Sequence, residues 1–179
     1  MSSWQSLIRD IPDFPAPGVV FKDITPLLSD AAAFGAVVEK LADLGRDTAG
    51  QPCVDLVAGI EARGFILAAP VALALGAGFV PIRKQGKLPS DTHAVSYDLE
   101  YGAATIEVHR DAFPAGSRVL MIDDVLATGG TLAAAVELVR ACDADLVGVA
   151  VLMELGFLAG RARLQTADPA VPLTALSVV

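Results

Sequence analysis

The segment from Arg118 to Thr131 constrains the fold more than any other part of the sequence. Its run Val119–Ile122 is wholly apolar and is followed directly by Asp123 and Asp124. Such a run predicts a strand that is covered on both faces, which is typical of a parallel sheet with helices on both sides. Ligands of these sheets bind at the carboxyl ends of the strands. We therefore predict that the two carboxylates lie at the ligand-binding edge of an α/β fold.

A short loop rich in Gly and Thr follows the two acids, and an Ala-rich helical pattern begins at Leu132. The loop residues are Ala127, Thr128, Gly129, Gly130 and Thr131. Glycines allow close backbone approach to an anion, and N–H groups at a helix N-terminus favour phosphate. Two adjacent carboxylates can accept hydrogen bonds from vicinal hydroxyls of a ribose. Loop and acids together predict a sugar phosphate as ligand.

The alternative is an ordinary strand–turn–helix in which Thr128 or Thr131 caps the helix. Capping accounts for one Thr and one Gly. It leaves two acids at the end of an apolar strand unexplained, and each of them needs solvent or a partner. The phosphate-binding interpretation is therefore favoured.

Composition and charge narrow the classes of function. The chain has 179 residues, 54% of them hydrophobic and 6% aromatic, which fits one domain with an aliphatic core. A net charge of -8 argues against nucleic-acid binding and against a membrane surface as partner. Cys53 and Cys142 have no metal-type spacing and are expected to be buried free thiols. The first ten residues lack the apolar core of a signal peptide, so a cytoplasmic location is expected.

Periodicity predicts strands that alternate with helices, and hence a mostly parallel twisted sheet flanked by helices. Helices are expected over residues 3–10, 31–44, 64–75 and 132–142, and strands over 54–58, 78–82, 105–109, 119–122, 146–152 and 171–178. The Pro-rich residues 11–21 are expected to be extended or turning. Residues 85–102 are expected to form a long functional or mobile loop.

Two further groups of cations accompany strand ends. Arg63 lies in a second strand–turn–helix junction, which suits a second anion or, as the plainer alternative, is a capped helix start with a surface Arg. Arg83, Lys84 and Lys87 open the polar segment and form either a solvated basic turn or a clamp for pyrophosphate. We favour the clamp, because the three cations directly follow a strand and could stabilise charge on a leaving group.

Two more segments leave their role open. Glu100 lies between Tyr97 and Tyr101, and a loop carboxylate there could act as a general base, although chemistry alone favours a solvent-facing hairpin. Residues 17–24 are largely apolar and could either pack or recognise a planar base. Sequence chemistry does not separate those two interpretations.

The run 119–131 resembles the 5-phosphoribosyl-1-pyrophosphate (PRPP) signature of the type I phosphoribosyltransferases. That pattern is four hydrophobic residues, two acids and a loop containing Ala-Thr-Gly-Gly-Thr, and every position matches. Residues 13–24, 59–65, 82–89, 96–102 and 153–155 extend the resemblance over about residues 8–164, most of the chain. Pro-Gly-Val-Val-Phe and Leu-Glu-Tyr-Gly point to the members of the family that act on adenine.

The resemblance implies a single domain over residues 1–179 with a small N-terminal hood mainly from residues 1–30. It implies transfer of the phosphoribosyl group of PRPP to adenine, giving AMP and pyrophosphate in purine salvage. Magnesium would be the cofactor, held mainly through PRPP oxygens and water and not directly by the protein. The enzyme would be a homodimer in which an arginine of one subunit reaches the other's site.

The resemblance also assigns roles to individual residues. The 5′-phosphate would bind to Ala127, Thr128, Gly129, Gly130 and Thr131, the ribose to Asp123 and Asp124, pyrophosphate to Arg63, Arg83, Lys84 and Lys87, and adenine to Val20, Phe21, Lys22 and Leu155. Glu100 would move the proton on the base, with Asp123 and Asp124 as the other catalytic residues. The segment 156–164 departs from the pattern, which leaves the hood contact near Leu155 less defined.

Two alternatives remain at this stage. The same PRPP loop serves enzymes that act on hypoxanthine, guanine, xanthine or orotate. A PRPP-sensing regulator would bind the ligand without turnover, but such proteins usually need a nucleic-acid surface. The sequence has no basic stripe and no helix-turn-helix segment, so the regulator ranks lower.

Overall fold

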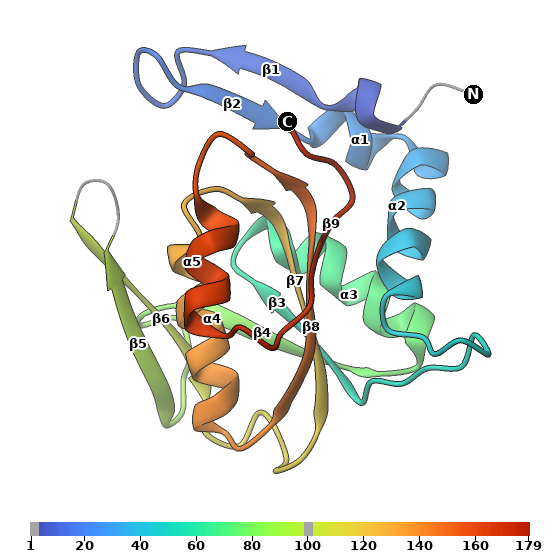
Figure 1. The fold of residues 1–179 in the computed structure, drawn as a ribbon, viewed down its shortest axis with the longest axis vertical. Coiled ribbons are helices and arrows are strands. Elements are labelled where there is room, and N and C mark those ends of the chain that lie inside the picture. Colours follow the sequence, from blue (N-terminus) through green and yellow to red (C-terminus); the bar gives the residue numbers. More distant parts are fainter. Residues whose placement is uncertain (1–3, 99–101) are drawn as a thin grey trace. The chain divides into compact units, whose positions relative to one another are not determined.

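The computed structural model describes residues 4–98 and 102–179 (Figure 1). The chain divides into two compact units, residues 1–40 and 41–179.

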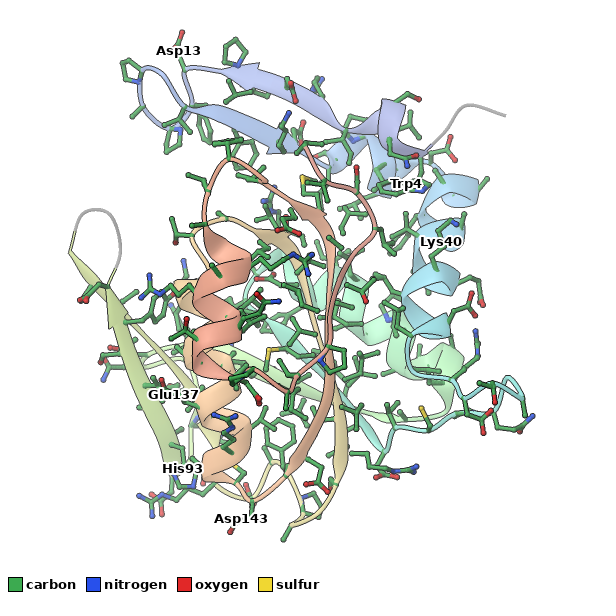
Figure 2. The ribbon with its side chains drawn as sticks, in the orientation of Figure 1. Trp4, Asp13, Lys40, His93, Glu137 and Asp143 are labelled. Carbon is green, nitrogen blue, oxygen red and sulfur yellow. The ribbon has the colours of Figure 1, made fainter. Side chains whose placement is uncertain are left out.

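The smaller unit is built around a β-hairpin. A 3-10 turn, η1 (Trp4–Leu7), precedes the antiparallel strands β1 (Arg9–Pro12) and β2 (Val20–Asp23). Ion pairs from Arg9 to Asp23 (2.6 Å) and from Lys22 to Asp10 (2.8 Å) join the two strands. Asp13 lies at the turn end of the hairpin and accepts the Gly18 N–H at 2.8 Å (Figure 2). The helix predicted over residues 3–10 is limited to this 3-10 turn and is wrong for Arg9 and Asp10, which form ladder pairs in β1.

Two helices follow the hairpin. They are α1 (Thr25–Ser29) and α2 (Ala31–Asp43). The Asp30 carboxylate accepts the Ala33 N–H at 2.9 Å, the hydrogen bond expected of an N-cap. This confirms the helix predicted from residue 31.

The larger unit contains a seven-stranded sheet in the order β5-β6-β4-β3-β7-β8-β9. Its strands are β3 (Leu56–Ile60), β4 (Gly78–Lys84), β5 (Thr92–Asp98), β6 (Ala103–His109), β7 (Arg118–Leu126), β8 (Asp145–Glu154) and β9 (Leu173–Ala175). The neighbouring strands β4, β3, β7, β8 and β9 pair in parallel in that order. Strand β6 runs antiparallel to both β4 and β5. The mostly parallel sheet predicted from the sequence is confirmed.

The direction of winding reverses between β3 and β7. From β3 the chain passes through α3 (Arg63–Leu75) to β4 on one side, and from β7 it passes through α4 (Gly130–Ala141) to β8 on the other. Parallel crossovers are right-handed, so the reversal places α3 and α4 on opposite faces of the sheet (Figure 1). The crevice between the ends of β3 and β7 is therefore a topological switch point, where ligands bind in such folds.

The core of this unit is aliphatic, as the composition predicts. Val119, Leu120, Met121 and Ile122 are all buried, as expected for a central strand covered on both faces. Side chains of the sheet and of α4 fill the space between them (Figure 2). Cys142 is buried and free, whereas Cys53 is free but only partly buried.

Several predicted boundaries are wrong. The strand predicted over residues 54–58 begins at Leu56, and β7 continues through both acids to Leu126. Residues 85–102 are not one long loop, because β5 pairs with β6 from Thr92↔His109 to Asp98↔Ala103. The predicted loop is thus wrong for residues 92–98, whereas the solvent-facing hairpin considered for Glu100 stays a prediction, because residues 99–101 lie outside the described part of the chain.

The C-terminal part differs as well. The helix α5 (Gly160–Ala167) was not predicted, and the last strand is limited to Leu173–Ala175 plus a single bridge between Glu154 and Val178. No helix in residues 4–98 and 102–179 is long and apolar enough to cross a membrane.

Close packing of α3 on β3 generates the first prediction. A Cβ on Gly59 would lie 2.7 Å from the Ala68 Cβ and 2.9 Å from the Phe79 ring. Gly59→Ala should lower the free energy of unfolding by about 1–3 kcal/mol through overpacking. The matched control is Gly35→Ala on an exposed face of α2, where a Cβ meets nothing within 4 Å. It should raise that free energy by about 0.5–1 kcal/mol. Urea denaturation measures both, and a Gly59→Ala protein as stable as wild type would contradict the packing.

Candidate active site

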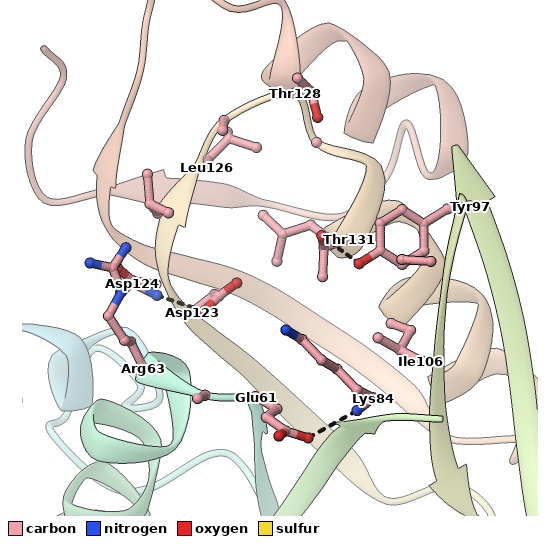
Figure 3. Close-up of a pocket in the computed structure, with 16 residues that line it drawn as sticks. Glu61, Arg63, Lys84, Tyr97, Ile106, Asp123, Asp124, Leu126, Thr128 and Thr131 are labelled. Carbon is pink, nitrogen blue, oxygen red and sulfur yellow. Dashed lines mark hydrogen bonds and ion pairs between the residues drawn. The ribbon is translucent and has the colours of Figure 1, made fainter. Parts of the chain in front are cut away.

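A cavity of about 360 Å³ opens at the switch point (Figure 3). Its lining comes from the β3–α3 turn, the end of β4, the β5–β6 hairpin and the segment from Asp123 to Leu132. All of these segments belong to the larger unit. The structure therefore brings the two strand–turn–helix junctions singled out in the sequence to one cavity.

The two adjacent carboxylates lie at the base of this cavity. Asp124 is 4% exposed and forms an ion pair with Arg63 at 2.6 Å. Asp123 accepts the Asp124 backbone N–H at 2.9 Å. Burial raises the pKa of Asp123 well above its ordinary value, and the charge of Asp124 raises that pKa further. Burial also raises the pKa of Asp124, against the opposing effect of Arg63.

The Gly/Thr loop wraps one side of the cavity. Ala127, Thr128, Gly129 and Thr131 line it, and Gly130 is the buried first residue of α4. The helix N-cap is Gly129 in a left-handed conformation with φ 80°, and it makes no side-chain cap hydrogen bond. The alternative in which a threonine caps this helix is therefore wrong. Both threonine hydroxyls are left to other partners, and Thr131 donates to the Tyr97 hydroxyl at 3.0 Å.

The loop backbone rests directly on α5. A Cβ on Gly129 would lie 2.5 Å from the Gly160 carbonyl oxygen, and one on Gly160 would clash with the Ala127 carbonyl oxygen. The next residue, Arg161, forms an ion pair with the buried Glu154 at 2.5 Å and donates to the Leu173 carbonyl at 3.0 Å. These contacts join α5 to the ends of β8 and β9, next to the loop that Gly160 contacts.

The predicted cations do not all face the cavity. Arg63 and Lys84 line it. Arg83, next to Lys84 on β4, points away, as alternation along a strand requires. The Arg83 guanidinium lies 3.4 Å from Glu61 and donates to the Lys87 carbonyl at 2.9 Å. Lys87 also lies outside the lining. Of the three cations predicted to form the clamp, Lys84 alone lines this cavity, together with Arg63 from the other junction.

Sequence reasoning missed the carboxylates that shape this basic turn. Glu61 accepts the Lys84 N–H at 3.0 Å. Glu107 is only 5% exposed and accepts the N–H groups of Gly86 and Leu88 at 3.0 and 3.3 Å. Two backbone N–H groups on one buried carboxylate fix the turn that carries Lys87. A charged residue between the apolar Ile106 and Val108 was the available signal.

The remaining predicted residues belong to different units of the chain or lie outside the described residues. Val20, Phe21 and Lys22 form β2 of the smaller unit, whereas Leu155 follows β8 in the larger unit and donates its N–H to the Leu126 carbonyl at 2.9 Å. Glu100 lies outside the described residues. The assignment of these residues to adenine therefore stays a prediction.

The donor set also bears on magnesium. Within residues 4–98 and 102–179, no three His, Cys, Asp or Glu side chains gather as potential metal ligands. Magnesium prefers oxygen ligands and usually keeps water and substrate phosphates in its coordination sphere. Two carboxylates beside an anion site fit an ion that arrives with a phosphorylated substrate.

Comparison with known proteins identifies the class to which this fold and site belong. The model of the phosphoribosyl transferase domain matches residues 28–168, and the chain belongs to this family. The adenine phosphoribosyltransferase of Nocardioides sp. is 62% identical over 179 residues, 100% of this chain and 95% of that protein. The enzyme of the same name from Thermobifida fusca is 62% identical over 96% of this chain and 93% of its own length.

Solved structures give the same result. Adenine phosphoribosyltransferase from Thermoanaerobacter pseudethanolicus superposes with a TM-score of 0.89 at 46% identity, covering 98% of this chain and 97% of that one. The enzyme from Giardia lamblia, complexed with 9-deazaadenine, gives 0.90 at 39% identity over 100% and 99% of the two chains. The family and fold predicted from the sequence are confirmed.

The buried acidic pair generates a prediction of opposite effects on stability and activity. A carboxyl whose folded-state pKa is raised destabilises the fold as pH rises from its unfolded pKa towards the folded value. Asp123→Asn removes that titration and keeps an oxygen for the Asp124 N–H. Its melting temperature should therefore exceed that of wild type at pH 7, with the difference disappearing towards pH 4, while turnover falls. The control is Asp143→Asn, an exposed residue in the turn between α4 and β8 (Figure 2), which should change neither quantity. A melting temperature below wild type at pH 7 would refute the pKa assignment.

Proposed function

We propose that this chain transfers the phosphoribosyl group of PRPP to adenine, giving AMP and pyrophosphate. One observation carries the proposal. A single cavity has a Gly/Thr loop at a helix N-terminus on one side, Arg63 and Lys84 on the other, and two carboxylates between them. PRPP has the same order of groups, with a monoester phosphate at one end, a pyrophosphate at the other and ribose hydroxyls between. The names of the relatives support adenine as the base.

The loop 127–131 would bind the 5′-phosphate through backbone N–H groups and threonine hydroxyls. Asp123 and Asp124 would accept hydrogen bonds from the ribose hydroxyls. In the structure Arg63 forms an ion pair with Asp124. When PRPP enters, its hydroxyls would satisfy the carboxylate while its pyrophosphate attracts the guanidinium, so the ion pair exchanges one partner for another.

The reaction would be a displacement at the anomeric carbon, with oxocarbenium character in the transition state. The adenine ring nitrogen forms the new bond, the bond to pyrophosphate breaks, and the base loses a proton to Glu100. Magnesium, when bound to pyrophosphate and sugar oxygens, would screen charge on the leaving group. Arg63 and Lys84 would stabilise that charge from the protein side.

The residues outside this cavity complete the proposal. Val20 and Lys22 would read the edge of adenine through their backbones, and Phe21 and Leu155 would pack on its ring, with residues 1–30 as the hood of a single domain. We propose a cytoplasmic homodimer. Arg83 does not line the cavity of its own chain, and it would be the arginine that reaches the pyrophosphate bound by the partner subunit. Lys87 would also bind pyrophosphate.

The decisive experiment is pyrophosphate release from PRPP with a panel of bases, with and without magnesium. We expect release with adenine and magnesium, and little with hypoxanthine, guanine, xanthine or orotate. If turnover is highest with a 6-oxopurine such as hypoxanthine or guanine, that base and not adenine is the substrate. Ligand binding without release for any base would favour a PRPP-sensing regulator.

The assignment of the ribose site is tested by Asp124→Asn. Loss of the charge that orients the ribose should lower turnover at least about tenfold, or about 1.4 kcal/mol in transition-state stabilisation. Steady-state kinetics with adenine and PRPP measures this effect, with Asp143→Asn as the matched control. Wild-type kinetics in Asp124→Asn would remove the acidic pair from the mechanism.

A further inference from the structure

Tyr97 connects the β5–β6 hairpin to the Gly/Thr loop. It lies near the end of β5, lines the cavity, and its hydroxyl lies 3.0 Å from the Thr131 hydroxyl (Figure 3). A Cβ on Gly130 would lie 3.0 Å from the Tyr97 ring, so the ring packs on the backbone at the start of α4. The phenol is thus held in place by packing, and its hydroxyl meets the last residue of the loop.

The donor and acceptor capacities of these two hydroxyls define what they can do. Each hydroxyl has one proton and can also accept. In the structure the Thr131 hydroxyl donates to the Tyr97 hydroxyl. A phosphate dianion offers only acceptors, so Thr131 can bind it only by redirecting its proton. The Tyr97 proton can then turn towards the Thr131 oxygen, which keeps a hydrogen bond between the two side chains.

The surroundings favour such a reversal. Thr131 makes no capping bond to the helix, so its hydroxyl is not committed to the backbone. The loop 127–131 is supported on its other side by the contact of Gly129 with Gly160. Tyr97 therefore contacts a loop hydroxyl, that of Thr131, whose orientation is not fixed by a hydrogen bond to the backbone.

We propose that Tyr97 is a positioning residue for the 5′-phosphate. It holds the Thr131 hydroxyl at the cavity and donates to it when Thr131 donates to a phosphate monoester. A chain of two hydrogen bonds then runs from the phenol through Thr131 to the phosphate. This inference rests on the proposed function, because it deepens the role of the loop 127–131.

The experiment measures dissociation constants of ribose 5-phosphate and of pyrophosphate by calorimetry. Tyr97→Phe should weaken ribose 5-phosphate about threefold to tenfold, the value of one hydrogen bond, and leave pyrophosphate unchanged. Thr131→Val should weaken ribose 5-phosphate at least as much, and adding Tyr97→Phe to it should have no further effect. Thr131→Ser keeps the hydroxyl and should bind like wild type. The matched control is Ser96→Ala, which removes the hydroxyl pair with Thr105 (2.8 Å) on the same hairpin and should not change either constant.

The outcomes separate the two proposals. If wild type does not bind ribose 5-phosphate, the phosphate loop itself is wrong and the inference falls with it. If wild type binds and Tyr97→Phe binds equally well, only the role of Tyr97 is overturned. Equal weakening of both ligands, or additive effects of Tyr97→Phe and Thr131→Val, would show that Tyr97 has a merely structural role.

Discussion

The reversal of winding between β3 and β7 is the constraint on which the site depends. Two neighbouring parallel strands send their chains in opposite directions, so nothing crosses the crevice between their carboxyl ends. Both junctions, at Arg63 and at Asp123–Thr131, then face one cavity. The reversal also places α3 and α4 on opposite faces, and the N-terminus of α4 meets the loop that would bind phosphate.

Opposite charges meet inside the cavity, where Asp124 forms an ion pair with Arg63. Two carboxylates in a confined space repel each other, and burial penalises their charged forms. Arg63 offsets part of this by its ion pair with Asp124, while burial raises the pKa of Asp123 well above its ordinary value. A polyanionic sugar would change the partners of these charged groups. Without such a ligand, burying the two carboxylates lowers the free energy of unfolding.

Much of the fold could be predicted because its signals are local. The apolar run Val119–Ile122 is long enough to identify a central strand, and the Gly/Thr loop after two acids predicts the position of the cavity at the end of that strand. β5 was missed because its alternation is short, with only Val95 and Tyr97 as large apolar residues, and because this edge strand is positioned by pairing with β6. Glu107 and the Glu154–Arg161 pair were missed for a related reason: their roles arise from contacts between residues that the fold brings together. Which of Arg83 and Lys84 faces the cavity depends on strand register, which the spacing of residues alone does not specify.

The contact between Gly129 and Gly160 has a consequence for how this protein can vary. At this contact the backbone of the loop 127–131 lies against the backbone of α5. The path of the loop at Gly129 therefore does not depend on a side-chain rotamer. The outward positions of α5, such as Ala162 and Gln165, are exposed and can change freely. Neither glycine can gain a side chain without separating the two segments, so divergence should accumulate around this point while the pair itself stays invariant.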